Sequence, residues 1–256
     1  MKEFNWGISM CDDIDDYSIA QIENIRNKSS LKDATIVMMP DTHPGNYAPI
    51  GFSASIDRED LTSLQPSVVG NDIGCGVTSV NIEIPKKKFS FEKLDNIIKD
   101  SCITSNRKTA EEYINFTEVD NVLDGLYCRD HINLDRAYDT FGTLGGGNHF
   151  IEIEEDSDKC LHLTIHSGSR NLGTQVYKYY QDLASSLNPD VPYIDACLYS
   201  KNYIGKYISD VIVTSLYATN SRIYMMLKII KECKMKYDVK SIINKPHNCI
   251  DWHDEI

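Results

Sequence analysis

The chain has 256 residues, of which 41% are hydrophobic and 25% are charged, the composition of an ordinary globular protein that can bury a substantial core. With 26 Lys and Arg against 38 Asp and Glu, the net charge is −12, which excludes a generally basic nucleic-acid coat but not nucleic acid held at one metal-assisted site. No apolar run reaches the roughly 18 residues of a membrane helix, and the acidic start MKEFNWGISMCDDIDD does not resemble a secretory signal, so we expect a cytoplasmic protein.

The eight cysteines are scattered along the chain and never form a Cys-x-x-Cys pair. Together with the lack of a signal sequence, this pattern indicates a reducing compartment. We expect most of these cysteines to be small buried hydrophobic residues. Only Cys75, which lies among glycines three residues after Asp72, has neighbours that suggest chemistry.

Hydrophobic periodicity predicts the first elements of the chain. Isoleucines recur at helical spacing and predict a helix over residues 15–27. The apolar, partly β-branched run 35–39 predicts a buried strand, which we expect Pro40 to end. Alternation of apolar and polar residues predicts a half-buried strand over residues 80–84. Ser90 is placed to cap a helix that carries apolar residues from Phe91 onward.

The same signals continue through the second half of the chain. We expect strands over 150–154, 161–165 and 241–243, and helices over 172–187 and 204–237. In the strand 161–165, three apolar residues share one face, and His162, Thr164 and His166 share the other. No repeat or linker is visible. The sequence therefore predicts one α+β domain over residues 1–256, with mixed β-sheets and flanking helices.

Charge is distributed unevenly along the chain. Residues 201–247 carry nine Lys and Arg against three acidic residues, a local charge of +6. A solvated helix face is the interpretation we favour. An electrostatic track for a polyanion is the alternative.

Polar side chains that often bind ligands recur beside glycines at the ends of predicted strands, where they stand on a rigid base. Asp41 and His43 follow the first predicted strand, although an ordinary Pro/Gly turn also explains this motif. Asp72 and Cys75 lie in the run Gly-Asn-Asp-Ile-Gly-Cys-Gly, where a tight turn lets both side chains reach one ion. Carboxylate and thiolate ligands suit Zn²⁺, or Mn²⁺ where oxygen and nitrogen dominate. A glycine turn with a buried thiol is the alternative.

Two further motifs combine glycine with histidine. The run 142–152 has three consecutive glycines, whose N–H groups can face a phosphate, followed by His149. It matches neither the Rossmann nor the P-loop pattern, and a hairpin loop is the alternative. His166 ends the strand 161–165, and Ser167, Ser169 and Arg170 then precede a helix, as in an oxyanion or phosphate site.

A last motif, His247-Asn248, follows the predicted strand 241–243. We assign His162 a structural role, because it lies deeper in its strand, and leave His253 unassigned. Taken together, one carboxylate, one cysteine and up to three histidines predict a two-metal site with a bridging thiolate. Such a site clamps a phosphoryl group during in-line displacement.

The motifs MPDTHPG, GNDIGCG, GTLGGGNHFIE, HSGSRNLG and HN resemble, in the same order, those of the RtcB family of RNA ligases, also called tRNA-splicing ligases. The resemblance covers residues 34–248. Residues 207–230 also resemble the helix that precedes the His-Asn motif in this family, with Ser221-Arg222 where Asn-Arg is usual. The sequence is thus similar to the amino-terminal part of the family, and an RtcB-like fold is expected.

The resemblance implies an RNA-repair and tRNA-splicing activity that uses GTP and two Mn²⁺ ions. RNA ending in a 3′-phosphate or 2′,3′-cyclic phosphate would be joined to RNA with a 5′-hydroxyl, after a histidine is guanylylated and GMP moves to the 3′-phosphate. Archease would be a possible helper. Carried over by motif, the implied metal ligands are Asp72, Cys75, His149, His166 and His247, with Cys75 bridging two ions. The other implied site residues are Asn148, Glu152 and Asn248 for the nucleotide, Arg170 for an RNA phosphate, and Asp41 and His43 for the pocket wall.

The sequence departs from the family pattern in two places. The family's Tyr-Gly-Phe-Pro-Ile-Gly is Asn46-Tyr-Ala-Pro-Ile-Gly51 here, which we expect to alter one pocket wall. Family members also continue well past the His-Asn motif, and that portion carries the guanylylated histidine, a lysine and most of the guanine pocket. The resemblance therefore implies a fragment or a paralogue truncated at the C-terminus that does not form the guanylyl-enzyme. The alternatives are a metal-dependent phosphoesterase acting on RNA ends without GTP and a non-catalytic metal- or RNA-binding remnant.

Overall fold

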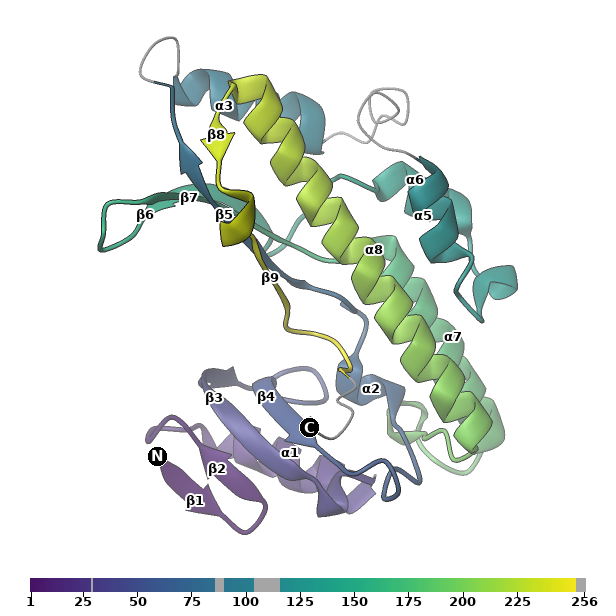
Figure 1. The fold of residues 1–256 in the computed structure, drawn as a ribbon. Helices are drawn as coiled ribbons and strands as arrows, with labels where there is room; N and C mark the ends of the chain where they lie inside the picture. The colour runs from purple at the N-terminus through teal and green to yellow at the C-terminus, as the bar shows by residue number, and fades with distance from the viewer. Residues whose placement is uncertain (29, 86–89, 104–115, 252–256) are drawn as a thin grey trace. The chain divides into compact units, whose positions relative to one another are not determined.

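The computed structural model describes residues 1–28, 30–85, 90–103 and 116–251. The chain divides into two compact units, one of residues 1–71 and 177–207 and the other of residues 72–176 and 208–256 (Figure 1). Each unit combines helices with a β-sheet, which confirms the α+β class. The single-domain prediction stays a prediction.

The first unit is built on a four-stranded sheet in the order β1-β2-β3-β4. Strands β2 and β3 are parallel and the other pairs are antiparallel. Helix α1, predicted over 15–27, buries Ile22 and Ile25 against Trp6, Ile36 and Met38. The elements here are β1 (Lys2–Phe4), β2 (Gly7–Ser9), α1 (Asp16–Lys28), η1 (Ser30–Asp33), β3 (Thr35–His43), β4 (Ile50–Ser55) and α2 (Pro66–Val69).

Strand β3 continues through Pro40, so the prediction that Pro40 ends it was wrong. Pairing with β2 stops at Met38, and the register with β4 shifts between Met38 and His43. A proline is tolerated at such an irregular place because no ladder hydrogen bond there needs its missing N–H. Asp41 and His43 consequently lie within β3, both exposed, and the Nδ1 atom of His43 bonds the Asp41 carbonyl at 2.8 Å.

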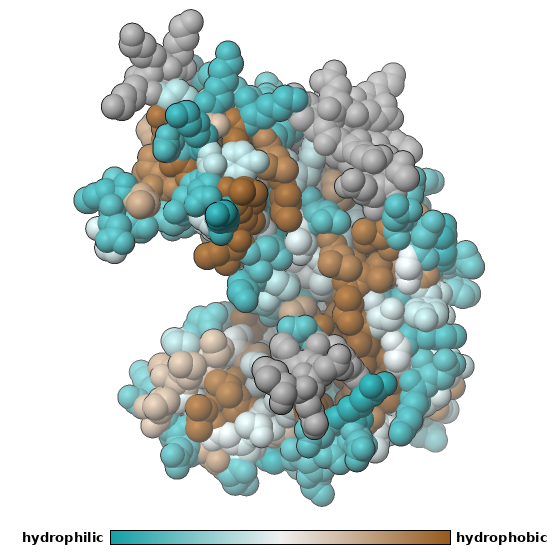
Figure 2. All heavy atoms as spheres, viewed as in Figure 1, coloured by the Kyte–Doolittle hydropathy of each residue, from teal (hydrophilic) through white to brown (hydrophobic). Residues whose placement is uncertain are grey.

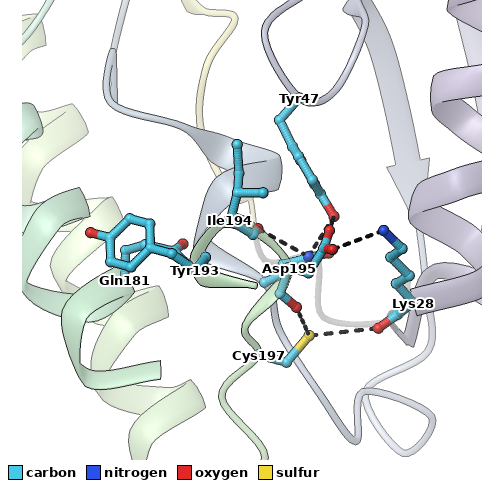
Figure 3. A network of polar contacts seen from close by, with 8 residues as sticks. Lys28, Tyr47, Gln181, Tyr193, Ile194, Asp195 and Cys197 are labelled. Atoms are coloured by element: carbon cyan, nitrogen blue, oxygen red, sulfur yellow. Dashed lines mark hydrogen bonds and ion pairs between the residues drawn. The ribbon is translucent and has the colours of Figure 1, made fainter. Parts of the chain in front are cut away.

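A polar network within the first unit anchors the connection between α7 (Asn171–Leu187) and α8 (Lys201–Cys233), which passes through η4 (Tyr193–Asp195) (Figure 3). Asp195 pairs with the Lys28 ammonium at 2.9 Å and accepts from the Tyr47 hydroxyl at 3.1 Å. Cys197 donates to the Lys28 carbonyl at 3.6 Å. Burial, reinforced by Asp195, raises the pKa of Tyr47, so its hydroxyl remains a donor at neutral pH.

The second unit contains an antiparallel sheet centred on β5 (Gly76–Glu83). On one side of β5 lie β7 (Leu161–Ser167) and then β6 (Phe150–Glu155). On the other side, β9 (Ile243–Pro246) pairs with its beginning and β8 (Lys236–Tyr237) with its end. The strands predicted over 80–84, 150–154 and 161–165 are thus confirmed, although β5 begins earlier and ends at Glu83, and the other two are longer. Leu163 and Ile165 are fully buried on β7.

Several helices accompany this sheet. Ser90 caps α3 (Phe91–Ile98) as predicted, because its hydroxyl accepts from the Lys93 N–H at 3.1 Å. The helices not predicted from sequence are η2 (Lys99–Ile103), α5 (Phe116–Leu123), η3 (Arg129–His131) and α6 (Leu134–Thr140). Helix α8 ends at Cys233 rather than 237, because Lys234 adopts a left-handed conformation and Lys236 pairs with β5. Residues 239–241 form the 3-10 helix η5, and the last strand begins at Ile243.

Helix α8 carries residues of mixed character. Of the basic residues in the run 201–247, Arg222 and Lys228 are buried, so the surface carries less positive charge than the sequence indicates. The large apolar residues exposed on α8 are Ile212, Leu216 and Leu227, and Figure 2 shows hydrophobic residues gathered over this helix. Across the part of the chain that the structure describes, no helix combines the length and apolar character that crossing a bilayer requires.

Candidate metal centre

The predicted ligand residues of the second unit meet at one edge of its sheet. Because neighbouring strands are antiparallel, the beginnings of β5 and β6 lie beside the ends of β7 and β9. Cys75 and His149 directly precede β5 and β6, His166 lies near the end of β7, and His247 directly follows β9. The register pairs Gly76 with both Ser167 and Pro246, so four segments distant in sequence place their side chains together.

A tight turn brings Asp72 to the same place. The Cys75 N–H donates to the Asp72 carbonyl at 3.1 Å, and Gly74 between them has a φ of 78°. A turn of this kind favours glycine at its third position, because a left-handed backbone is strained for other residues. Gly168 packs against the Asp72 carboxylate, where a Cβ atom would come within 2.7 Å of Oδ1. The glycines of these motifs therefore serve close packing around the site.

Two groups of potential metal ligands share the Cys75 sulfur. In one group, the ligand atoms of Cys75, His166 and His247 lie within 4.8 Å of one another, and in the other those of Asp72, Cys75 and His149 do. The Cys75 sulfur is 3.3 Å from Nε2 of His166 and 3.7 Å from Nε2 of His149. Nε2 of His166 is 3.2 Å from Nε2 of His247. Carboxylate, thiolate and imidazole together form a donor set that suits a borderline divalent ion.

Hydrogen bonds orient two of the imidazoles toward the sulfur. Nδ1 of His149 bonds the Leu144 carbonyl at 2.9 Å, and Nδ1 of His166 bonds the Asn148 carbonyl at 3.0 Å. A carbonyl can only accept, so each Nδ1 carries the proton and each Nε2 presents a lone pair to the centre. This arrangement is typical of metal-bound histidine. Burial also lowers the pKa of His149, which keeps the ring neutral at physiological pH.

The cysteine differs from the histidines in its protonation. Burial, with the Asp72 charge as a second cause, raises the pKa of Cys75 to about 12, so the thiol is protonated at neutral pH. Cys75 and His166 are buried, whereas Asp72 and His247 are exposed. The centre thus has a buried side that excludes water and an exposed side that a ligand can reach. A divalent ion would displace the thiol proton on binding.

Arg170 occupies a strained position beside this centre. It has a φ of 60°, rare for a residue other than glycine, at the beginning of α7. Its Nε atom is buried and has no hydrogen-bond partner among the described residues. Gly145 lies against its guanidinium so closely that a Cβ atom there would overlap it. Strain and an unsatisfied donor together indicate a functional position.

The serines predicted to help bind an anion have other partners. Ser167 donates to the Leu144 carbonyl at 2.8 Å, and Ser169 donates to the Ile73 carbonyl. Both residues are fully buried. Their hydroxyls hold neighbouring loops in place, so the expectation that they belong to an oxyanion site was wrong. His162 bonds the Asp156 carboxylate at 2.9 Å, in keeping with the structural role assigned to it.

The residues predicted to contact the nucleotide or line the pocket have different surroundings. Asn148 contributes its carbonyl to His166, and Glu152 is exposed on β6. The backbone of Asn248 exchanges hydrogen bonds with the turn at Cys75, because Gly74 donates to its carbonyl at 2.7 Å. The nucleotide-binding roles of these three residues stay predictions. Asp41 and His43 belong to the first unit, whereas all five predicted metal ligands belong to the second.

One buried residue at this site was missed as a functional candidate. Arg222 on α8 is 0% exposed and donates to the carbonyls of Gly74 and Ser167, the neighbours of Cys75 and His166. Its only sequence signal was the likeness of Ser221-Arg222 to a family motif. Its position in the positive run 201–247 instead suggested a residue on a solvated surface. Burial lowers the pKa of Arg222 to about 10, so it remains charged at neutral pH.

Comparison with known proteins identifies relatives of the chain. The family model "tRNA-splicing ligase RtcB" matches residues 21–127 and 101–255. RNA-splicing ligase RtcB2 of Escherichia coli is 28% identical over 184 residues, covering 64% of this chain and 41% of that protein. RNA-splicing ligase RtcB of Escherichia coli K12 is 26% identical over 226 residues, covering 76% of this chain and 52% of the relative.

An archaeal relative matches the chain with similar identity and coverage. The tRNA-splicing ligase RtcB of Aeropyrum pernix is 27% identical over 211 residues, which cover 64% of this chain and 44% of the relative. The chain thus spans about half the length of the curated relatives it matches. Because the family model matches nearly the whole chain and the metal-ligand motifs converge as described, the chain belongs to the RtcB family of tRNA-splicing ligases.

Proposed function

We propose that the second unit holds two divalent metal ions, Mn²⁺ in the first instance, for the joining of RNA ends. The observation that carries this proposal is the Cys75 sulfur, which belongs to both donor groups. Two ions that share a thiolate would neutralise the charge on a phosphoryl group and align it for displacement. Asp72 and His149 would complete one ion's protein ligands, and His166 and His247 the other's.

Arg170 would hold the phosphate of the RNA. Its guanidinium lies against Gly145, and its backbone has a φ of 60°. A guanidinium forms strong paired hydrogen bonds with phosphate oxygens, and it needs no proton transfer to do so. The role of a residue of this kind is to position the RNA end and stabilise developing charge. Arg170 and the metal ligands belong to the same unit.

The reaction proposed for the assembled enzyme is GTP-dependent ligation of a 3′-phosphate or 2′,3′-cyclic phosphate end to a 5′-hydroxyl end. Asn148, Glu152 and Asn248 would contact the guanine nucleotide, and Asp41 and His43 would line the pocket. RNA is the proposed partner, with archease as a possible helper and the cytoplasm as the setting. None of the residues described here is assigned as the guanylylated nucleophile, so ligation would need a further segment of the family's chain.

The test of this proposal uses RNA with a 3′-phosphate and RNA with a 5′-hydroxyl, together with Mn²⁺, with and without GTP. We expect ligation only when GTP is present and the carboxy-terminal half of the Escherichia coli K12 relative is added. Ligation should be lost with Cys75→Ala and kept with Cys160→Ala, which removes an exposed cysteine. Phosphate release without GTP would instead support a phosphoesterase, and metal binding without any turnover a non-catalytic remnant.

A further inference from the structure

Arg222 is a buried cation of the second unit whose donors are all bonded. It is 0% exposed and is among the large side chains that are fully buried. Nη1 donates to the carbonyls of Gly74 at 2.8 Å and Ser167 at 2.6 Å. Nε donates to Thr78 at 3.0 Å, and Nη2 to Thr219 at 3.3 Å and Asn244 at 3.0 Å. These bonds account for all five donors of a guanidinium, and every acceptor is a neutral oxygen.

The acceptors lie on the segments that carry the metal ligands. Gly74 precedes Cys75, Ser167 follows His166, and Asn244 is on β9, the strand that ends directly before His247. Thr78 and Asn244 also bond each other at 2.7 Å, and Asn244 donates to Thr219 at 3.1 Å. A single planar group thus joins β5, β7 and β9 to α8 behind the donor atoms.

We propose that Arg222 is a positioning residue that sets the spacing of Cys75, His166 and His247 for metal binding. This inference rests on the proposed metal centre. The supporting observation is geometric: the rigid fork of the guanidinium fixes the distance between the Gly74 and Ser167 carbonyls that it bridges. Partners of this kind, which touch the ligand-bearing backbone rather than the ion, commonly set metal affinity.

The charge of Arg222 and its positioning role predict opposite effects on metal affinity when the residue is replaced. A buried cation near the centre repels a divalent ion, so removal of its charge would strengthen metal binding if Coulomb interaction were the only contribution. If positioning dominates, removal of the fork takes away the hydrogen bonds that Arg222 donates to the carbonyls of Gly74 and Ser167 and lets the strand ends separate. Metal binding then becomes weaker.

The experiment measures Co²⁺ binding to the full chain by titration, with the thiolate-to-Co²⁺ charge-transfer band reporting on Cys75. We expect Arg222→Met to bind Co²⁺ about 10- to 100-fold more weakly than the unmodified chain, with a reduced or shifted band. Arg222→Lys keeps the charge but not the fork, so it should not restore the affinity. The matched control is Met226→Ala, one turn further along α8, which removes a fully buried apolar side chain outside this network.

The controls separate positioning from general loss of stability. Circular dichroism and urea unfolding establish that each variant is folded before titration. Should Arg222→Met fail to fold, Asn244→Ala removes the side-chain bonds that tie β9 to Arg222, Thr78 and Thr219 and leaves the guanidinium in place. We then expect about tenfold weaker binding with the same direction of spectral change. If folded Arg222→Met keeps the Co²⁺ affinity and the spectrum of the unmodified chain, or if Arg222→Lys restores them, the positioning role is wrong. The proposed metal centre is not affected by that result. Absence of the band in the unmodified chain overturns the centre and the inference together.

Discussion

Gly145 and Gly147 are two glycines of one loop with similar positive φ but different surroundings, and this difference isolates the role of Arg170. Gly145 has a φ of 88° and lies against the Arg170 guanidinium, whereas Gly147 has a φ of 77° and a Cβ atom on it would meet nothing within 4 Å. The three glycines of this loop are therefore not equivalent. Only substitution at the first of them must move the arginine.

We predict that Gly145→Ala weakens binding of a short 3′-phosphorylated RNA by about tenfold or more, because a displaced guanidinium loses charged hydrogen bonds to phosphate. Metal stoichiometry should remain that of the unmodified chain. Gly147→Ala is the control, because that position has a similar positive φ and open space around it, and this variant should bind RNA normally. Fluorescence anisotropy measures the affinity. Equal losses in the two variants would show that loop rigidity, rather than the position of Arg170, controls binding.

The protonation of Cys75 predicts how metal affinity depends on pH. Burial raises the pKa of this thiol to about 12, while His149 has a lowered pKa and is neutral at pH 7. Between about pH 7 and pH 8 a binding ion therefore displaces one proton, from the thiol. Affinity should increase about tenfold per pH unit, following one-proton linkage.

Titration calorimetry in buffers of different ionisation enthalpy measures this proton release directly. We expect release of one proton per bound Mn²⁺ pair from Cys75, and loss of this release in Cys75→Ser. Affinity that is independent of pH over this interval would show that the cysteine is not a ligand. The same comparison at lower pH should show further loss of affinity as His149 becomes protonated.

At the scale of elements, α8 packs directly on the turn that carries Cys75. A Cβ atom on Gly74 would lie 2.9 Å from the Ala218 side chain and from the Ser215 backbone, both on α8. Gly70 also has a positive φ, 75° with a ψ of −165°, but open space around it. Substitution at Gly70 therefore meets backbone strain alone, whereas substitution at Gly74 also meets α8.

We predict that Gly70→Ala lowers the free energy of unfolding by about 1–3 kcal/mol, because its backbone conformation lies in a region open essentially only to glycine. Gly74→Ala should lower it further, by about 1–3 kcal/mol more, because the added methyl group overpacks against α8. Urea unfolding measures both variants. A Gly74→Ala protein no less stable than Gly70→Ala would contradict the tight packing of this turn on the helix.

At the scale of the whole molecule, the predicted metal ligands are all in one of the two compact units. Asp72, Cys75, His149, His166 and His247 belong to the unit of residues 72–176 and 208–256. A ligand stabilises the part of the structure that binds it, because binding favours the folded state of that part. Metal should consequently affect the two units differently.

We predict that Mn²⁺ slows amide hydrogen exchange in β5, β7 and β9 while leaving β1 to β4 of the first unit unchanged. The physical reason is that local opening of the ligand-bearing strands must first release the ion. Exchange measured by mass spectrometry with and without Mn²⁺, and after chelation, provides the test. Equal protection in both units, or none in β5 and β7, would contradict a metal centre confined to the second unit.

The sequence by itself determined the elements with strong local signals and the family of the chain. The isoleucine spacing of α1, the Ser90 cap and the alternation of β6 depend on neighbouring residues alone, so they could be predicted. The glycine motifs likewise predicted four of the candidate metal ligands, and the His247-Asn248 motif, together with the family resemblance, predicted the fifth. Short strands such as β1 and β2 lack such periodicity, and Pro40 was misread because its tolerance depends on where pairing with β2 stops.

Only the tertiary structure decided how these residues act together. The antiparallel register of β5, β7 and β9 brings strand ends together, and no local pattern encodes that register. The buried serines and Arg222 were assigned to anion binding and to a charged run because the sequence shows charge and polarity but not burial. Their partners are carbonyls on distant segments, and such pairs exist only once the chain has packed.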